Sequence, residues 1–318
     1  MSTYKYRKLL SYITLAVLLT ISVLTWQHYE KTAMEREERR YNEYVNSVVE
    51  DVTERLDKHK MILRGGAGLF SASEEVTREE WLAYYQYQQV STLYPGIQGI
   101  AFSKVVQSPE LEQHIEEIRA EDFSDYMIWP EGEHDLYVPV VFIEPFDEQN
   151  QYYLGYDLFS EAVLRTVMER AQNTGEASMS DMVSLMDETG EGTQPGFLMF
   201  VPVYAQGMPL NSPEERRETL EGYVFGTYFM DELMQGIFPD PMHHIDFHIY
   251  DGSEASPEAL MYYSHVSLDA PGNERRPLFT SQKNLDMFGH QWTIVLETTP
   301  VFEAAVDQYT PKGILAAG

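Results

Sequence analysis

The sequence predicts an α+β fold in which a transmembrane helix and a long stalk helix precede two blocks of strands. Three observations lead to this prediction. An uncharged apolar run covers residues 9–26, and the chain from there to about residue 63 contains neither proline nor glycine. Strand-like segments then follow one another with few intervening helices. This order favours α+β over a doubly wound parallel sheet.

The predicted transmembrane helix covers residues 9–26 and follows three cations within residues 1–8. A helix of this length reaches about 27 Å, nearly across the hydrocarbon core of a bilayer, and Trp26 would lie at the interface. The basic flank is expected in the cytoplasm, which places the rest of the chain outside the inner membrane. A cleaved signal peptide is the alternative, although no small-x-small site follows the run.

The predicted stalk helix covers residues 27–64. Apolar side chains recur there at intervals of three and four, as Tyr41, Val45 and Val48 do, and charged residues occupy the other faces. An ordinary surface helix of the domain is the alternative. The length of the segment and its continuity with the apolar run favour a stalk, which could also carry the contact of a homodimer. The glycine cluster at 65–68 is expected to interrupt the helix.

Two blocks of strands follow the stalk and divide at about residues 236–241. A helix is expected to start at Thr77, which with Glu80 has the spacing of a capping box. Further helices are expected at about 161–173 and 230–236, and residues 310–318 look like the beginning of a second transmembrane helix. The expected strands are 97–106, 136–143, 178–185, 197–204 and 222–229 in the first block and 244–250, 261–265, 277–281 and 291–298 in the second.

The composition excludes several classes of protein. The chain has no cysteine, so disulfides and thiolate chemistry are excluded, and its net charge of −29 repels nucleic acids. Short signatures of common catalytic and nucleotide-binding sites are absent, and we expect no cofactor. His244, Asp246 and His248 could share one face of a strand and hold a metal ion. Polar residues on an edge strand are the alternative, which we favour.

Asp157 lies between Tyr156 and Leu158 in a block rich in aromatic residues. A carboxylate in an aromatic-lined cavity could accept hydrogen bonds from the N–H groups of a small ligand. Asp157 could equally cap the helix that starts near Glu161, or a local turn. The residues alone leave both interpretations open.

Four segments carry a resemblance to a known family. They resemble, in order and spacing, the CHASE domain, which is the extracellular sensory domain of bacterial histidine kinases and cyclases and of plant cytokinin receptors. The resemblance covers roughly residues 70–305. The segments are YPGIQGIAFS (94–103), YVPVVFIEPFDEQNQYYLGYDLFSEAVLRTVMERAQNTGEA (137–177), GFLMFVPVY (196–204) and EERRETLEGYVFGTYFMDELMQGI (214–237).

The resemblance implies a stalk that carries two PAS-like modules. The membrane-distal module at 65–236 would bind the ligand, and the membrane-proximal module at 237–309 would lead to a second membrane span. Asp157 aligns with the aspartate that holds the adenine-type ligand in the plant receptors. Phe200 stands where those receptors have threonine, so a cytokinin is not the expected ligand. The ligand-binding residues that the resemblance implies are Asp157, Met179, Phe200, Tyr204 and Tyr223.

The sequence therefore predicts a membrane-embedded sensor without catalytic activity of its own. It would bind an unknown small molecule and pass the change along the stalks of a homodimer to a cytoplasmic histidine kinase or diguanylate cyclase. A periplasmic protein-interaction module without a small-molecule ligand is the second hypothesis. A metal-dependent hydrolase built on residues 243–248 is the third.

Overall fold

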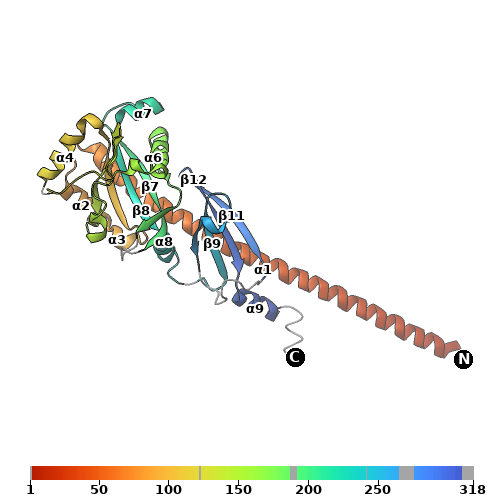
Figure 1. Cartoon of the computed structure of the whole chain (residues 1–318). Coiled ribbons are helices and arrows are strands. Elements are labelled where there is room, and N and C mark those ends of the chain that lie inside the picture. Colours follow the sequence, from red (N-terminus) through yellow and green to blue (C-terminus); the bar gives the residue numbers. More distant parts are fainter. Residues whose placement is uncertain (1, 122, 187–191, 241, 265–275, 310–318) are drawn as a thin grey trace.

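The chain is built around one long helix, with two antiparallel sheets arranged along it (Figure 1). The predicted second transmembrane segment lies outside the described residues. Within the ranges given next, side chains are described from residue 12 to residue 306. The computed structural model describes residues 2–121, 123–186, 192–240, 242–264 and 276–309.

The larger sheet is antiparallel, with strands in the order β4-β1-β8-β7-β5, and β6 also pairs with β7. Alternation along β8 gives the sheet two buried faces: Val224 and Tyr228 belong to the cluster that includes helix α1, whereas Tyr223 and Phe225 pack with helix α6. The strands are β1 (Gly99–Lys104), β4 (Val140–Glu144), β5 (Ser178–Met179), β6 (Val183–Met186), β7 (Thr193–Tyr204) and β8 (Leu220–Phe229).

The smaller sheet has the strand order β10-β9-β12-β11 and begins after a helix that ends at Ile237. Its buried side chains include Phe247, Ile249, Trp292 and Ile294. A separate two-stranded ribbon joins β2 to β3. These strands are β2 (Val106–Gln107), β3 (Leu136–Tyr137), β9 (Ile245–Asp251), β10 (Leu260–Tyr263), β11 (Thr280–Met287) and β12 (His290–Thr298).

The helices cover the faces and the ends of the two sheets (Figure 1). The predicted capping box is confirmed, because the Thr77 side chain accepts from the Glu80 backbone N–H while Glu80 accepts from the Thr77 N–H. The helices are α1 (Ser2–Ala72), α2 (Arg78–Gln88), α3 (Val90–Leu93), α4 (Leu111–Ala120), α5 (Glu148–Gln151), α6 (Ala162–Thr174), α7 (Pro213–Thr219), α8 (Met230–Ile237) and α9 (Pro300–Tyr309), with short 3₁₀ turns η1 (Ser108–Glu110), η2 (Leu158–Ser160) and η3 (Pro257–Ala259).

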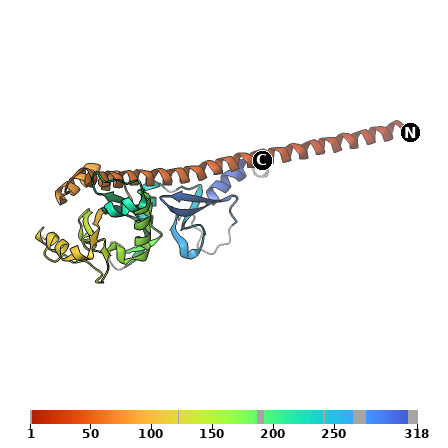
Figure 2. The ribbon, with the colours of Figure 1, turned by 90° about the horizontal axis from the view of Figure 1, so that it is seen from above.

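Helix α1 stands free at its N-terminal end and packs against both sheets along the rest of its length (Figure 2). The predicted apolar stripe is the packed face, since Tyr41, Val45, Val48 and Val52 are all buried. The Tyr41 hydroxyl also donates to the carbonyl oxygen of Leu296 in β12 at 2.9 Å. The two sheets of the chain itself therefore cover this apolar stripe of α1. A homodimer, which stays a prediction, would have to use another face of α1.

The transmembrane helix in the predicted fold class is wrong. Among the residues that the structure describes, no helix combines the length and the apolar character needed to cross a membrane. Within the described side chains the apolar run ends at Trp26. Gln27 and His28 follow it directly. The fold is a mixed α and β fold that begins with a long helix.

The glycine cluster does not interrupt α1, which continues to Ala72. A Cβ atom at Gly65 would lie 2.5 Å from the Tyr84 hydroxyl of α2. At Gly66 it would lie 3.2 Å from the Trp81 ring and 3.2 Å from a methyl group of Val224 in β8. The cluster therefore allows α1 to approach α2 and the larger sheet closely, and this packing offsets the low helix propensity of glycine.

Replacement of Gly66 by valine is expected to lower the free energy of unfolding by about 2 kcal/mol, because the added methyl groups would overlap Trp81 and Val224. Gly68→Ala is the matched control: nothing lies within 4 Å of its Cβ position, so alanine should raise stability by roughly 0.5–1 kcal/mol. Urea denaturation followed by circular dichroism measures both. An unchanged stability of the Gly66 variant would contradict close packing at this position.

Candidate functional site

A cavity of about 360 Å³ lies on the face of the larger sheet that is turned away from α1. Its volume is in the range of pockets that hold small molecules. Side chains from the sheet, from α5, from the start of α6 and from β6 surround it. The lining residues are Gln98, Val140, Ile143, Gln149, Asn150, Tyr153, Tyr156, Leu158, Glu161, Val163, Leu164, Met182, Val183, Ser184, Leu185, Met186, Leu198, Phe225, Thr227 and Phe229.

The sheet forms the back wall of the cavity through the alternation of its side chains. Phe225, Thr227 and Phe229 follow one another at every second position of β8 and so point to the same face. Leu198 of β7 is paired with Thr227 and adds to this wall. β6 forms a separate wall of the cavity, and this strand pairs with β7 from Val183 to Met186.

Three side-chain amides support the wall on the side of α5. The Gln98 amide nitrogen donates to the Gln149 side-chain oxygen at 3.0 Å, and the Gln149 nitrogen donates to the Met186 carbonyl of β6 at 3.2 Å. Asn150 donates to the carbonyl of Pro145 at 2.8 Å. Within the described residues, the side-chain oxygens of Gln98 and Asn150 accept no bond, which leaves them for a ligand that donates.

Glu161 is the only charged residue among the described ones that line the cavity. It is exposed, and its Oε1 accepts a hydrogen bond from the Tyr156 hydroxyl at 3.1 Å. Burial of the phenol, with the nearby Glu161 carboxylate as a smaller cause, raises the pKa of Tyr156 to about 12. Tyr156 therefore keeps its proton at neutral pH and holds Glu161 at the cavity.

Asp157, the first predicted ligand-binding residue, is buried beside the cavity rather than in its lining. Its Oδ1 accepts from the backbone N–H groups of Val138 at 2.8 Å and Phe159 at 3.1 Å, as the cap of η2. Oδ2 has no hydrogen-bond partner among the described residues. The turn interpretation is thus confirmed, and contact of Asp157 with a ligand stays a prediction.

Replacement of Asp157 by alanine is expected to lower the free energy of unfolding by about 2 kcal/mol, because two buried N–H groups lose their acceptor. Asp157→Asn is the matched control: it retains an oxygen in the Oδ1 position and should lose less. Thermal and urea denaturation of both variants measure the effect. Equal losses in the two variants would show that the charge of the Asp157 carboxylate, and not its two accepted hydrogen bonds, stabilises the fold.

None of the other predicted ligand-binding residues lines the cavity. Phe200 stacks on Phe225, with ring centroids 5.3 Å apart, and fills the core beneath α6. Met179 is buried in the cluster on the α1 side of the sheet. The hydroxyl of Tyr204 donates to the carbonyl of Gln172 at 2.8 Å.

Tyr223 packs edge-on against Phe200, and its hydroxyl donates to the Met168 carbonyl of α6 at 3.2 Å. The large ring of Phe200 therefore occupies space between the sheet and α6, and the cavity lies to its side, towards β6 and α5. The involvement of these residues in ligand binding stays a prediction. Alternation could have identified Tyr156 and Leu158, the two neighbours of Asp157 that do line the cavity.

The structure gives no support to a metal site on β9. Among the described residues, no three histidine, aspartate or glutamate side chains gather closely enough to hold a metal ion. The His248 ring instead packs edge-on against Tyr263 of β10 at 4.5 Å between centroids.

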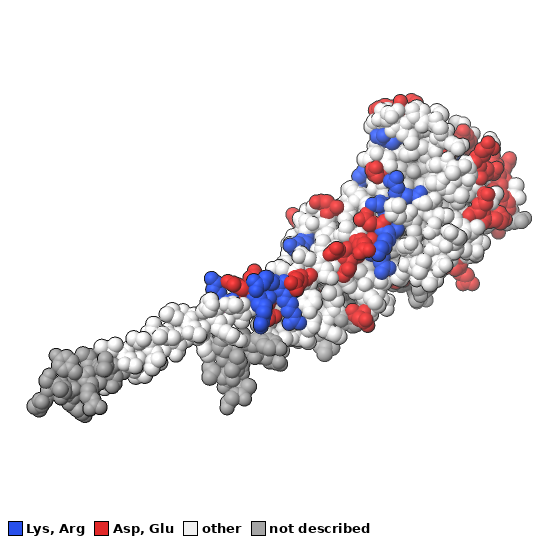
Figure 3. All heavy atoms as spheres, turned by 180° about the vertical axis from the view of Figure 1, so that it is seen from behind, with Lys and Arg blue, Asp and Glu red and all other residues white. Residues whose placement is uncertain are grey.

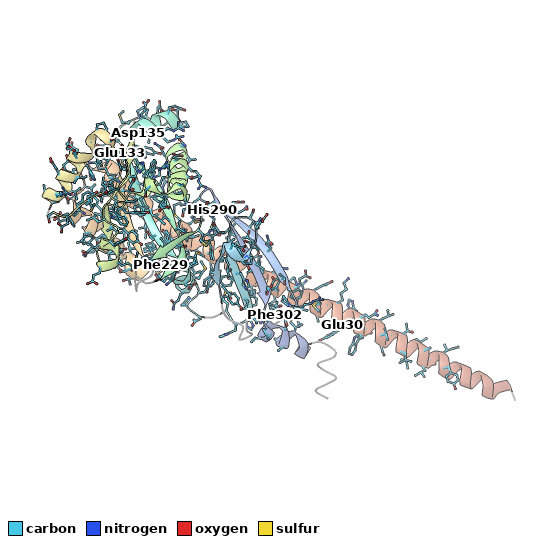
Figure 4. The ribbon with its side chains drawn as sticks, in the orientation of Figure 1. Glu30, Glu133, Asp135, Phe229, His290 and Phe302 are labelled. Atoms are coloured by element: carbon cyan, nitrogen blue, oxygen red, sulfur yellow. The ribbon has the colours of Figure 1, made fainter. Side chains whose placement is uncertain are left out.

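A histidine joins the wall of the cavity to the smaller sheet (Figure 4). His290, at the start of β12, lies with Nε2 2.6 Å from Asp251 of β9 and with Nδ1 3.2 Å from Asp181, which precedes β6. Asp251 also accepts from the backbone N–H of Met182, a cavity residue, at 3.0 Å. We call Asp181, His290 and Asp251 the Asp–His clasp.

A cavity in one sheet is thus tied to a second sheet on a shared helix, an arrangement compatible with an extracellular sensory module. The chain belongs to the CHASE domain family, whose model matches residues 74–262, more than half of the sequence. The resemblance seen in the sequence is thus confirmed.

Other comparisons add little. A solved structure described as an extracellular ligand binding receptor from Desulfohalobium retbaense DSM5692 aligns with a TM-score of 0.40 and 9% sequence identity. The alignment covers 86% of this chain and 40% of that one, so the chain spans well under half of that structure's length. No curated protein matches the sequence.

Proposed function

We propose that this sensory module binds a small molecule in the cavity of the larger sheet and acts without catalysis. The observation that carries the proposal is the cavity itself, a hollow of about 360 Å³ with mostly apolar walls and a few polar groups directed at its interior. Such a site suits recognition, because apolar contact gives affinity and a few hydrogen bonds give specificity.

The Asp–His clasp supplies a route by which binding alters the rest of the module. β6 forms one wall of the cavity, and Met182 at its start is bonded to Asp251 of the smaller sheet. A ligand that draws β6 towards α5 would therefore displace β9 and β12. The ligand can shift this equilibrium only by the difference in its affinity for the two arrangements.

The displacement would reach α1 and α9 at the far side of the smaller sheet. Tyr41 of α1 is bonded to β12. Phe302 of α9 is buried, and the Arg40 guanidinium of α1 lies 5.6 Å from the centre of its ring. The two helices would pass the change to an output domain, a histidine kinase or a diguanylate cyclase, that forms another part of the receptor.

Thr227→Trp tests the proposal by filling the cavity from its central strand, where Thr227 is only half-buried. The wild-type chain is expected to show ligand-induced thermal stabilisation with at least one compound of a metabolite library, and the tryptophan variant should lose that response. Thr227→Val is the matched control, because it keeps the volume of threonine and should retain the response.

Loss of the response supports the proposal only if the tryptophan variant folds. Circular dichroism and the melting temperature of the variant check its folding. A response retained by a folded Thr227→Trp variant would place the ligand elsewhere. Absence of any response in the wild type across the library would contradict small-molecule sensing.

A further inference from the structure

The residues that line the cavity indicate the charge of its ligand. Its described lining contains no lysine or arginine, and Glu161 supplies the single charged group. Tyr156 fixes this carboxylate at the cavity through the hydrogen bond to Oε1, which leaves Oε2 free of hydrogen bonds among the described residues. An anionic ligand would lose its hydration here and meet a carboxylate in return, so the site opposes anions.

Two further polar groups, the side-chain amides of Gln98 and Asn150, favour a ligand that donates hydrogen bonds. The oxygens of Gln98 and Asn150 have no donor among the described residues, whereas each amide nitrogen already donates once within the wall. A protonated amine carries donors and no acceptor, so it matches these oxygens and Glu161.

Aromatic rings complete the environment that suits a cation. Tyr153, Tyr156, Phe225 and Phe229 line the cavity, and the faces of such rings attract ammonium groups. The chain as a whole carries a net charge of −29, and acidic side chains gather over the end of the molecule that carries the larger sheet (Figure 3). A field of this sign raises the local concentration of cations.

We infer that the ligand of this cavity is a small organic cation, an amine with an aromatic or branched apolar body, and that Glu161 selects its charge. This inference rests on the proposed function and adds the chemical class of the ligand. The apolar part would lie against Leu198 and Phe225, and the ammonium group would face Glu161 and the amide oxygens.

Three probes of equal shape test the inference: phenethylamine, 2-phenylethanol and phenylacetate, each titrated against the full chain by isothermal titration calorimetry at pH 7. The amine is expected to bind about fivefold more tightly than the alcohol, the gain for a partly exposed ion pair, and phenylacetate should bind most weakly. The preference for the amine should shrink in 0.5 M salt, since Glu161 is exposed.

Glu161→Gln is expected to remove the preference for the amine over the alcohol while both still bind. Glu169→Gln is the matched control, because Glu169 is an exposed glutamate of the following helix that does not line the cavity. This variant should keep the preference.

The outcomes separate the two proposals. Equal binding of amine and alcohol, or tighter binding of phenylacetate, overturns the charge inference and leaves small-molecule sensing intact. A preference for the amine that survives in Glu161→Gln overturns the role of Glu161. If none of the three probes binds while an uncharged or anionic compound gives a response that Thr227→Trp abolishes, the cationic class is overturned and the proposed function stands. Absence of binding by the probes and by the whole library contradicts the proposed function.

Discussion

Acidification from pH 6.5 towards pH 4 is expected to destabilise the wild-type chain by a few kcal/mol more than a His59→Leu variant. His59 lies on the packed face of α1 with no exposed surface, and its ring stacks on Tyr228 at 5.5 Å between centroids. Among the described residues neither ring nitrogen has a hydrogen-bond partner. Burial, with the positive charge of Arg55 as a smaller cause, lowers the pKa of His59 from 6.5 to about 3.

The direction of the effect follows from proton linkage. Between pH 6.5 and about 3 the unfolded chain binds a proton at His59 that the folded chain does not, so the free energy of unfolding falls as the pH falls. The contribution is fully present above pH 6.5. The loss reaches roughly 2 kcal/mol at pH 5 and about 4 kcal/mol near pH 3.

Urea denaturation at pH 7, 6, 5 and 4 measures the effect as the difference between wild type and variant, which cancels the titration of the many carboxylates. His59→Leu should therefore lose less stability on acidification. His28→Leu is the matched control, because His28 is exposed on the free part of α1 and should leave the profile unchanged. Parallel profiles of wild type and His59→Leu would contradict a neutral buried histidine.

Replacement of His290 by glutamine is expected to disconnect the cavity from the smaller sheet. The His290 side chain is 10% exposed and the Asp251 side chain 19%, so their contact is shielded from water, whereas Asp181 is 62% exposed and contributes little. We expect a loss of about 1–2 kcal/mol in stability. The larger expected effect is on coupling: ligand binding should still occur, but the change in the smaller sheet should disappear.

Hydrogen exchange of the full chain, with and without a stabilising ligand, measures this coupling. In the wild type the ligand should alter the protection of amides in β9 and β12, and in His290→Gln the alteration should be confined to the larger sheet. His134→Gln is the matched control, because His134 is exposed and its ring packs against Tyr137, outside the Asp–His clasp. Undiminished changes in β9 and β12 of the His290 variant would show that another route carries the signal.

The arrangement of the cavity and α1 on opposite faces of one sheet explains why a clasp matters. A conformational change that passed directly from the cavity to α1 would have to deform the central strands β7 and β8. These strands pair with each other over most of their length. β6 pairs with β7 alone among the described strands and so can move at lower cost. The Asp–His clasp joins this edge to the smaller sheet.

Local patterns predicted much of the secondary structure. The capping box at Thr77 and Glu80 was expected because its two hydrogen bonds join residues three apart. The expected strand at 222–229 and helix at 161–173 coincide closely with β8 and α6, since alternation and amphipathic spacing are properties of short segments. The ordered motifs of the CHASE domain also identified the family.

Other features depend on contacts between distant segments, and sequence patterns within short segments did not predict them. The glycines of α1 looked like a helix end, but Trp81 and Val224 pack against them. The contact of the Phe200 ring with Phe225 in the core joins two neighbouring strands and was not predicted either. The sequence predicted Glu161 only as a residue near the start of a helix, because no residue near it in the sequence indicates a cavity.

The sequence by itself determined much of the order of helices and strands, the amphipathic face of α1 and the family, because each is encoded in residue types at short, regular intervals. Only the tertiary structure decided where the cavity lies, which carboxylate faces it and how it is tied to the smaller sheet. The physical reason is that these features arise from contacts such as that between His290 and Asp251, 39 residues apart, whose geometry depends on the packing of whole sheets.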